Sequence, residues 1–136
     1  RPVTYDGRPA LMIASKWGHL DIVEYLLNKG ANVDARNEDG DTSLLCAAAE
    51  SNCDIIQFLI GRNADIDAQN IDGNSAIILA SYYGHEECCM ILLSAGCNPT
   101  LRDTSGSSAL DVAKQKSHTS LVELLEYSVN NNSHIP

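Results

Sequence analysis

The stretch Asp39-Gly40-Asp41-Thr42-Ser43-Leu44-Leu45-Cys46-Ala47-Ala48-Ala49 decides the fold, because its pattern returns at a fixed interval along the chain. Glycines mark the turn of each copy at steps of 33 residues: Gly7, Gly40, Gly73 and Gly106. Two further residue types recur at the same step. An alanine recurs in the following helix, and a leucine recurs near the end of each copy: Ala14, Ala47, Ala80 and Ala113, then Leu26, Leu59, Leu92 and Leu125. Self-similarity at this period is typical of arrays in which each unit buries its apolar face against its neighbours.

The period divides the 136 residues into four units, at 1–34, 35–67, 68–100 and 101–127, and a polar tail at 128–136. In the first unit, Ile22, Val23, Leu26 and Leu27 form one apolar stripe at about 3.6 residues per turn, which predicts a helix. By the same reasoning each unit carries two helices, expected at 10–17 and 21–28, 43–50 and 53–60, 76–83 and 86–94, and 109–116 and 119–127. Asn63 stands at the C-cap position of the second unit, where Asn is the next best residue after Gly.

The two ends of the array differ in polarity. In the last unit, Glu126 replaces an apolar residue of the other units, and Asp111 and Lys114 make the first helix polar. A terminal repeat needs one water-facing side, so we expect the array to end here. The first unit shows no such polar cap, which predicts that further repeats or a capping segment precede Arg1.

The balance of charges narrows the classes of partner. The chain has 18 acidic and 9 basic residues, and its net charge is −9. Nucleic acids and anionic lipids require Lys and Arg to neutralise phosphate, so we expect neither a nucleic-acid partner nor a lipid surface. The apolar runs are too short for membrane insertion. The surplus carboxylates favour a neutral or basic protein partner, or they serve solubility alone.

We interpret the five cysteines as structural thiols. Their number is odd and no Cys-x-x-Cys occurs, so neither a disulfide framework nor a thiolate zinc site is indicated. Cys88, Cys89 and Cys97 stand where the other units carry mostly small or apolar residues, and a free cysteine behaves as a small hydrophobe in a core. Reduced thiols predict an intracellular protein. We expect it in the cytoplasm, and the nucleus is the alternative.

The sequence shows no arrangement of residues typical of a catalytic site. His19, His85 and His118 share one position of the repeat, and a catalytic residue would not recur every 33 residues, so we assign them a structural role. No Gly-x-Ser-x-Gly, Gly-x-Gly-x-x-Gly or His-Glu-x-x-His motif occurs. The run from His85 to Cys89 contains metal-ligating residue types, but a helix would direct Cys88 and Cys89 into the core. We expect no enzyme, no cofactor and no metal site.

The repeated residues resemble those of the ankyrin repeat, across about residues 1–127. The family pattern is Asp-x-x-Gly-x-Thr-Pro-Leu-His-x-Ala-x-x-x-Gly-His, then a Leu-Leu helix and Gly-Ala-(Asp/Asn)-Val-(Asn/Asp)-Ala. The first copy here contains Gly7, Leu11, Ala14, Gly18-His19, Leu26-Leu27 and Gly30-Ala31-Asn32-Val33-Asp34-Ala35. The resemblance implies an all-α solenoid of stacked helix-turn-helix pairs with β-hairpin fingers. No copy keeps the Pro or the His of Thr-Pro-Leu-His, but Ser and Thr at the same turn can still cap each helix.

The resemblance also implies where a partner would bind. Ankyrin arrays usually use a concave groove formed by the finger tips and the exposed side of each first helix. The matching finger positions here are Tyr5, Arg8, Arg36, Glu38, Asp39, Asp41, Ile71, Asp72, Asn74, Arg102 and Thr104. The matching helix positions are Lys16, Trp17, Glu50, Tyr82 and Tyr83.

Residue types at these positions suggest the chemistry of the partner. Four of the seven aromatic residues lie there, namely Tyr5, Trp17, Tyr82 and Tyr83, and exposed Trp and Tyr are enriched at interface hot spots. Acidic fingers surround them, which favours a protein or peptide whose Lys or Arg residues flank an apolar anchor. We therefore expect a monomeric protein-interaction module. The alternatives are a regulatory or targeting domain of a larger enzyme or channel acting on its own chain, and a passive spacer.

Overall fold

The chain forms four pairs of helices stacked in a row, in a computed structural model that describes residues 8–131 and the side chains from residue 10 onward. The pairs are α1 (Arg8–Trp17) with α2 (Leu20–Asn28), α3 (Ser43–Ala49) with α4 (Cys53–Gly61), α5 (Ala76–Tyr82) with α6 (Glu86–Ser94), and α7 (Ala109–Gln115) with α8 (Thr119–Asn130). The two helices of every pair begin and end within two residues of the predicted limits, apart from the end of α8.

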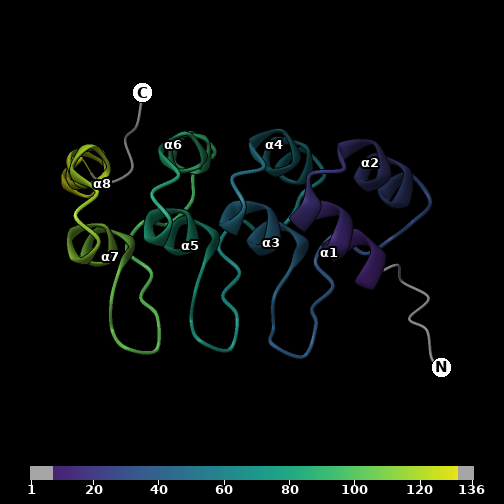
Figure 1. The fold of residues 1–136 in the computed structure, drawn as a ribbon, viewed down its shortest axis with the longest axis horizontal. Helices are drawn as coiled ribbons and strands as arrows, with labels where there is room; N and C mark the ends of the chain where they lie inside the picture. Colours follow the sequence, from purple (N-terminus) through teal and green to yellow (C-terminus); the bar gives the residue numbers. More distant parts are fainter. Residues whose placement is uncertain (1–7, 132–136) are drawn as a thin grey trace.

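The helices lie in two rows, with finger loops projecting from the first row (Figure 1). The first row contains α1, α3, α5 and α7, and the second contains α2, α4, α6 and α8. Each helix packs against its partner in the pair and against the neighbouring helix of its own row. This arrangement confirms the predicted all-α solenoid.

The core runs through the stack as a continuous layer between the two rows. The recurring leucine of the repeat is fully buried at Leu59, Leu92 and Leu125, and Leu26 is half-buried. Cys88 and Cys89 are also fully buried, as predicted, so their thiols replace the aliphatic side chains of the other repeats. Because each repeat buries residues against its neighbours in the stack, the stack derives its stability from contacts between repeats as well as within them.

Hydroxyl groups cap the first helices of the second, third and fourth repeats, as the sequence predicts. The side chains of Thr42, Ser75 and Ser108 each accept a hydrogen bond from the backbone N–H three residues later, at 3.3, 3.4 and 3.3 Å. In α7 the bond is reciprocal, because Asp111 accepts from the Ser108 N–H. That backbone hydrogen bond, helped by the Arg102 guanidinium, lowers the pKa of the Asp111 carboxyl. The hydroxyls thus replace the function of the missing proline at the helix start.

The fingers are hairpin-shaped loops with little strand pairing. Among residues 8–131 the only β-bridge joins Arg102 and Ser108, so the predicted β-hairpins are less regular than expected. Side chains fold the turns instead: the Oδ1 atoms of Asn37, Asn70 and Asp103 each accept two backbone N–H groups, from two and four residues later, at 2.9 to 3.0 Å. A short polar side chain that bonds its own backbone makes such a turn without a ladder.

The loops between paired helices tie each repeat to the one before it. His85 Nε2 donates to the carbonyl of Ala49 at 3.0 Å, and His118 Nε2 to the carbonyl of Tyr82 at 3.2 Å. Asn52, at the equivalent position, donates to two carbonyls near the end of α1 at 2.7 and 3.0 Å. The ends of first helices thereby find donors for carbonyls that lack a partner within the helix. These contacts confirm the structural role predicted for His85 and His118.

The last helix extends beyond its predicted end. The sequence predicts a helix that ends at residue 127 and a polar tail from 128, but α8 continues to Asn130. Ser128 explains the difference, because its side chain is fully buried and its Oγ donates to the carbonyl of Leu124 at 3.0 Å. Glu126 behaves as predicted for the water-facing side of the last repeat, and its carboxylate lies 3.8 Å from Lys114 Nζ. Residues 132–136 lie outside the described part.

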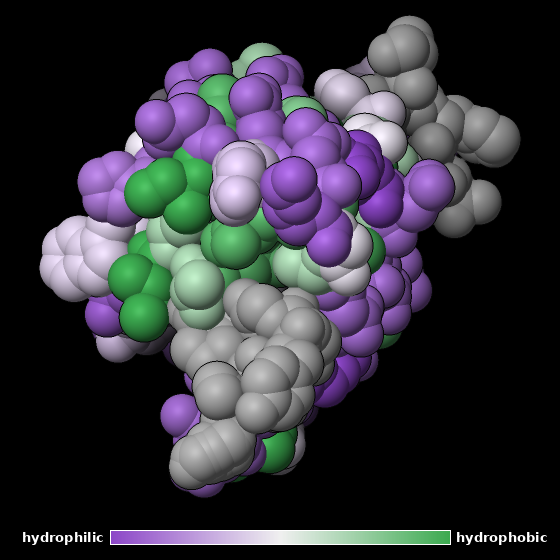
Figure 2. Space-filling model, turned by 90° about the vertical axis from the view of Figure 1, so that its right-hand side faces the viewer, coloured by the Kyte–Doolittle hydropathy of each residue, from purple (hydrophilic) through white to green (hydrophobic). Residues whose placement is uncertain are grey.

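Apolar side chains also reach the surface at the end of the stack formed by α1 and α2. Figure 2 views the molecule from this side and shows a green, hydrophobic area on it. Ile13 and Ile22 of these two helices are 58% and 44% exposed, and Tyr25 is 61% exposed. The opposite end carries the polar residues of α7 and α8, so the difference in polarity predicted from the sequence is present in the fold.

Within residues 8–131, three non-glycine residues adopt a left-handed backbone: Ser51, Asn63 and Ser117, with φ of 61°, 68° and 60°. Asn63 does so where the sequence predicts it. Ser51 and Ser117 stand where Gly18 and Gly84 occur in the other repeats, and a side chain at such an angle costs about 1 kcal/mol or more.

We therefore expect Ser117→Gly to raise the free energy of unfolding by about 0.5–1 kcal/mol, measured by urea denaturation. The substitution removes the steric cost at φ 60°, and the greater entropy of glycine in the unfolded chain offsets part of the gain. Ser120→Gly is the control, because this exposed serine lies inside α8, where glycine should lower stability by up to about 1 kcal/mol. Equal effects of the two substitutions would contradict the prediction.

Candidate functional site

The fingers are connected to one another by a row of side chains at one position of the repeat. Arg36 Nη1 donates to the carbonyl of Gly40 in its own finger at 2.9 Å and to that of Gln69 in the next finger at 3.0 Å. Gln69 Nε2 repeats the pattern with Gly73 at 2.8 Å and Arg102 at 2.9 Å. Arg102 closes the last finger and forms an ion pair with a carboxylate of α7 at 3.1 Å. Two predicted contact residues, Arg36 and Arg102, thus help to hold the fingers in a row.

The tips of the fingers lie next to one another and expose their side chains. Their backbones are joined by hydrogen bonds from Ile71 N–H to the carbonyl of Asp39 and from Thr104 N–H to that of Asp72, both 3.0 Å. The side chains of Asp39, Asp72 and Thr104 are exposed, as is that of Glu38. Ile71 is 64% exposed, so an aliphatic side chain stands among carboxylates at the middle finger. This finger row presents a largely acidic edge to a partner.

The aromatic residues predicted for the groove lie in two separate groups, one at the end of α1 and one at the end of α5. Trp17 is 65% exposed, and Lys16 Nζ lies 5.3 Å from the centre of its ring. Tyr82 and Tyr83 are 44% and 53% exposed, and their rings meet edge to face with centres 4.8 Å apart. Lys116 Nζ lies 4.3 Å from the centre of the Tyr82 ring.

Two shallow hollows lie between successive first helices and the fingers, and we call this surface the concave groove. The hollow between α3 and its neighbours, about 230 Å³, is lined by Lys16, Asp41, Leu45, Cys46, Ala49, Glu50, Asn70 and Leu79. The hollow between α5 and α7, about 260 Å³, is lined by Asn74, Ile78, Leu79, Tyr82, Tyr83, Asp103 and Val112. Finger residues and helix residues therefore meet in shared depressions, as the resemblance implies.

The structure brings together only part of the predicted set. Lys16, Asp41 and Glu50 share the first hollow, and Asn74, Tyr82 and Tyr83 share the second. Trp17 lines neither hollow. Tyr5 and the side chain of Arg8 lie outside the described residues. Burial raises the pKa of the Cys46 thiol in the first hollow to about 11, so this thiol is neutral there at physiological pH.

Sequence reasoning missed several of the lining residues, among them Asn70, Asp103 and Leu79. Asn70 Nδ2 donates to Asp41 Oδ1 at 2.8 Å, so it holds a carboxylate at the rim of the first hollow. The signal that could have identified Asn70 and Asp103 is their spacing: with Asn37 they recur every 33 residues, three positions before each turn glycine. Leu79 gives no comparable signal, because its place between two hollows depends on how α3, α5 and α7 pack.

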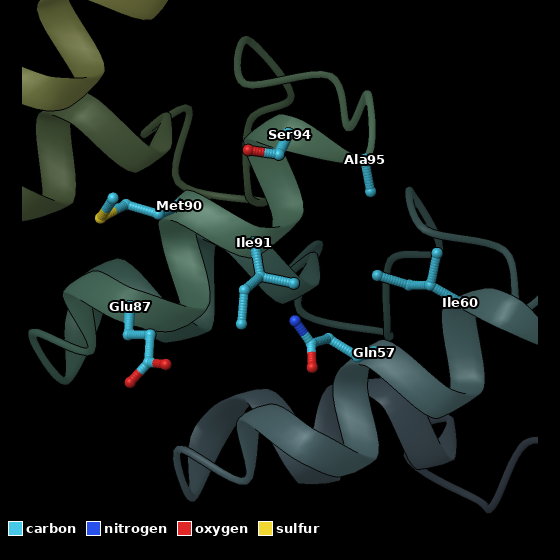
Figure 3. Close-up of a pocket in the computed structure, with 7 residues that line it drawn as sticks. All are labelled: Gln57, Ile60, Glu87, Met90, Ile91, Ser94 and Ala95. Atoms are coloured by element: carbon cyan, nitrogen blue, oxygen red, sulfur yellow. The ribbon is translucent and has the colours of Figure 1, made fainter.

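A larger hollow lies on the other side of the molecule, in the second row of helices. It measures about 510 Å³, lies between α4 and α6, and is lined by Gln57, Ile60, Glu87, Met90, Ile91, Ser94 and Ala95 (Figure 3). Met90 is 51% exposed and occupies a position at which the other repeats carry Glu24, Gln57 and Glu123. We call this surface the outer hollow. It contains none of the residues predicted to contact a partner.

Residues 8–131 contain no candidate metal site and no candidate membrane span. No group of three or more His, Cys, Asp or Glu side chains in this part of the chain is arranged to hold a metal ion. None of the helices described combines the length and the apolar character needed to cross a bilayer.

Comparison with known proteins agrees with the fold and the repeat spacing. A family model described as ankyrin repeats in three copies matches residues 2–70 and 44–134, which together span nearly the whole chain. A search among curated proteins gave no significant match. Ankyrin repeats are generally protein-interaction modules, and their members bind other proteins. With the 33-residue period, the paired helices in two rows and this match, the chain belongs to the ankyrin-repeat family.

Proposed function

We propose that the protein binds a protein or peptide segment in the concave groove. The observation that carries the proposal is the exposure of Trp17, Tyr82 and Tyr83 at the ends of first helices, where packing does not require aromatic side chains. Buried aromatic anchors dominate the energetics of many interfaces, because Trp and Tyr offer large area with few rotatable bonds. Both hollows of the groove also offer apolar floors, formed by side chains such as Leu45, Leu79 and Val112.

The charges of the groove suggest the kind of segment that fits. Asp41 and Glu50 line the first hollow, and Asp103 lines the second. Three more carboxylates are exposed on the finger row, those of Glu38, Asp39 and Asp72. Carboxylates are therefore available along the whole length of the groove. Two lysines beside the groove, Lys16 and Lys116, have their ammonium groups against the rings of Trp17 and Tyr82. We therefore infer a segment whose Lys or Arg residues flank an apolar or aromatic anchor. The free thiols of all five cysteines support an intracellular setting.

Selection from a random peptide library tests the proposal, because the library samples every order of basic and apolar residues. We expect the parent protein to enrich peptides with basic residues beside an apolar anchor. Trp17→Ala, Tyr82→Ala and Tyr83→Ala should each weaken binding of such a peptide by about 2 kcal/mol, or roughly 30-fold in Kd, measured by calorimetry. Tyr25→Ala is the control, because Tyr25 is equally exposed but lies in the second row of helices.

Two outcomes of this experiment would contradict the proposal. Unchanged affinity in all three aromatic variants would exclude the concave groove as the binding surface. Loss of affinity in Met90→Lys, with the groove variants unaffected, would move the binding surface to the outer hollow. Circular dichroism of each variant verifies that the repeats remain folded.

Charge reversal at the finger row should act mainly on the association rate. Asp39→Lys is expected to slow association with a basic peptide several-fold at low salt and to reduce the dependence of the rate on salt, because long-range attraction is lost. Stopped-flow measurements at two or more salt concentrations determine both quantities. Asp54→Lys is the matched control, since it makes the same change of charge at an exposed position of α4. The same loss in both variants would show that net charge alone, and not the finger row, attracts the peptide.

A further inference from the structure

Two of the five cysteines face each other where α4 meets α6. Cys53 is the first residue of α4, and Cys88 lies in the first turn of α6. Their Sγ atoms are 3.1 Å apart, about 1 Å farther than the bond of about 2.05 Å in a disulfide. Cys88 is fully buried and Cys53 is half-buried, so Cys53 is the member of the pair that reaches the surface.

The repeat does not require a sulfur at either position. The residues equivalent to Cys53 in the other repeats are Leu20, Glu86 and Thr119, and those equivalent to Cys88 are Ile22, Ile55 and Leu121. An aliphatic side chain would therefore fill the place of Cys88 in the core. The pair arises because two different positions of adjacent repeats both carry cysteine, which places one thiol beside another only in this part of the stack.

The other cysteines lack a comparable partner. Cys89 Sγ lies 3.6 Å from the hydroxyl of Ser81, and no sulfur–sulfur contact of Cys46, Cys89 or Cys97 occurs within the described residues. Burial raises the pKa of the Cys97 thiol to about 12, which keeps it neutral and unreactive. Among the described cysteines, only Cys53 is thus both half-buried and in contact with a second sulfur.

We propose that Cys53 and Cys88 are a site of oxidative modification, at which a peroxide converts two thiols into a disulfide between the second and third repeats. In the first step, the sulfur of Cys53 attacks one oxygen of the peroxide, which gives a sulfenic acid and releases water when the oxidant is hydrogen peroxide. In the second step, the sulfur of Cys88 attacks Cys53 Sγ. The S–S bond forms, the S–O bond breaks, and the hydroxyl leaves with the Cys88 proton as a second water.

The geometry favours the second step once the first has occurred. The attacking sulfur is already 3.1 Å from its target, so the reaction is intramolecular between preoriented groups. Burial raises the pKa of the Cys88 thiol to about 12, and the hydrogen bond with Cys53 contributes in the same direction, so proximity must compensate for a low fraction of thiolate. The oxidised pair would tie the amino ends of α4 and α6, the two helices that form the walls of the outer hollow (Figure 3).

The experiment treats the folded, reduced protein with dilute hydrogen peroxide, quenches it, and counts thiols in denaturant by alkylation and mass spectrometry. We expect a product that has lost two of its five thiols and the mass of two hydrogen atoms, and whose digest contains one peptide linking Cys53 to Cys88. Dithiothreitol should restore all five thiols. The oxidised protein should also unfold at a temperature about 5 °C or more above the reduced one, because the cross-link restricts the unfolded chain.

Single alanine variants assign the effect to the pair. Cys53→Ala should abolish the cross-link and the thermal shift, and Cys46→Ala, which removes another half-buried thiol, should retain both. Cys88→Ala should also abolish the cross-link, but this change in the core can prevent folding. In that case Cys53→Ala alone tests the proposal. Retention of five thiols after treatment, a cross-link between other cysteines, or an unchanged loss in Cys53→Ala would overturn the proposal. Equal unfolding temperatures of the oxidised and reduced proteins would contradict the proposal that the disulfide stabilises the contact between the second and third repeats.

Discussion

Gly73→Ala is expected to lower the free energy of unfolding by about 3 kcal/mol, measured by urea or thermal denaturation. Gly73 has a φ of 77°, where an L side chain is strained. An added Cβ would also lie 2.8 Å from Asp103 Cα and 2.8 Å from Thr104 N, both backbone atoms of the next finger. The finger would have to move away, which breaks the hydrogen bond from the Thr104 N–H to the Asp72 carbonyl.

Gly106→Ala separates the two causes of this loss. Gly106 occupies the same position of the repeat with a φ of 85°, but nothing lies within 4 Å of its added Cβ. The expected loss is therefore about 1–2 kcal/mol, from backbone strain alone. Equal losses at the two positions would show that close approach of neighbouring fingers contributes nothing to stability. Gly40→Ala should give an intermediate value, since its nearest neighbour, Ile71 N, lies at 3.1 Å.

Leu92→Ala should cost about 3–4 kcal/mol of unfolding free energy. Leu92 lies in α6 and is fully buried in the core, so truncation leaves a cavity that neighbours on both sides cannot fill. The loss should be visible by denaturation and by faster amide exchange in α4 and α6, because each repeat supports its neighbours.

Leu26→Ala is the matched control for the core substitution. Leu26 is the same residue at the same position of the repeat, but in α2 it is only half-buried. We expect it to cost about half as much as Leu92→Ala, since less apolar area is removed from water on folding. A larger loss at Leu26 than at Leu92 would contradict the assignment of the core from burial.

The helices and their pairing could be predicted from the sequence, whereas the shape of the groove could not. The apolar stripe of each helix and the hydroxyl caps depend on residues close together in the sequence, so a single sequence is enough to recognise them. The extension of α8 was missed because its cause is tertiary: Ser128 is polar in sequence but buried in the fold. Arg36 and Arg102 were predicted as contact residues from their finger positions in the ankyrin pattern. Arg36 also bonds carbonyls of its own and the next finger, and Arg102 a carbonyl of its own finger, contacts that depend on how the fingers fold and are spaced.

By itself, the sequence determined the period, the family resemblance and the positions at which aromatic residues depart from the repeat. These follow from spacing, because residues 33 apart experience the same environment in a stacked array. Only the tertiary structure decided which of those positions share a hollow, that Trp17 stands apart from Tyr82 and Tyr83, and that Cys53 and Cys88 meet. The reason is physical: the repeat fixes each residue within its own unit, but contacts between units depend on how adjacent helices pack.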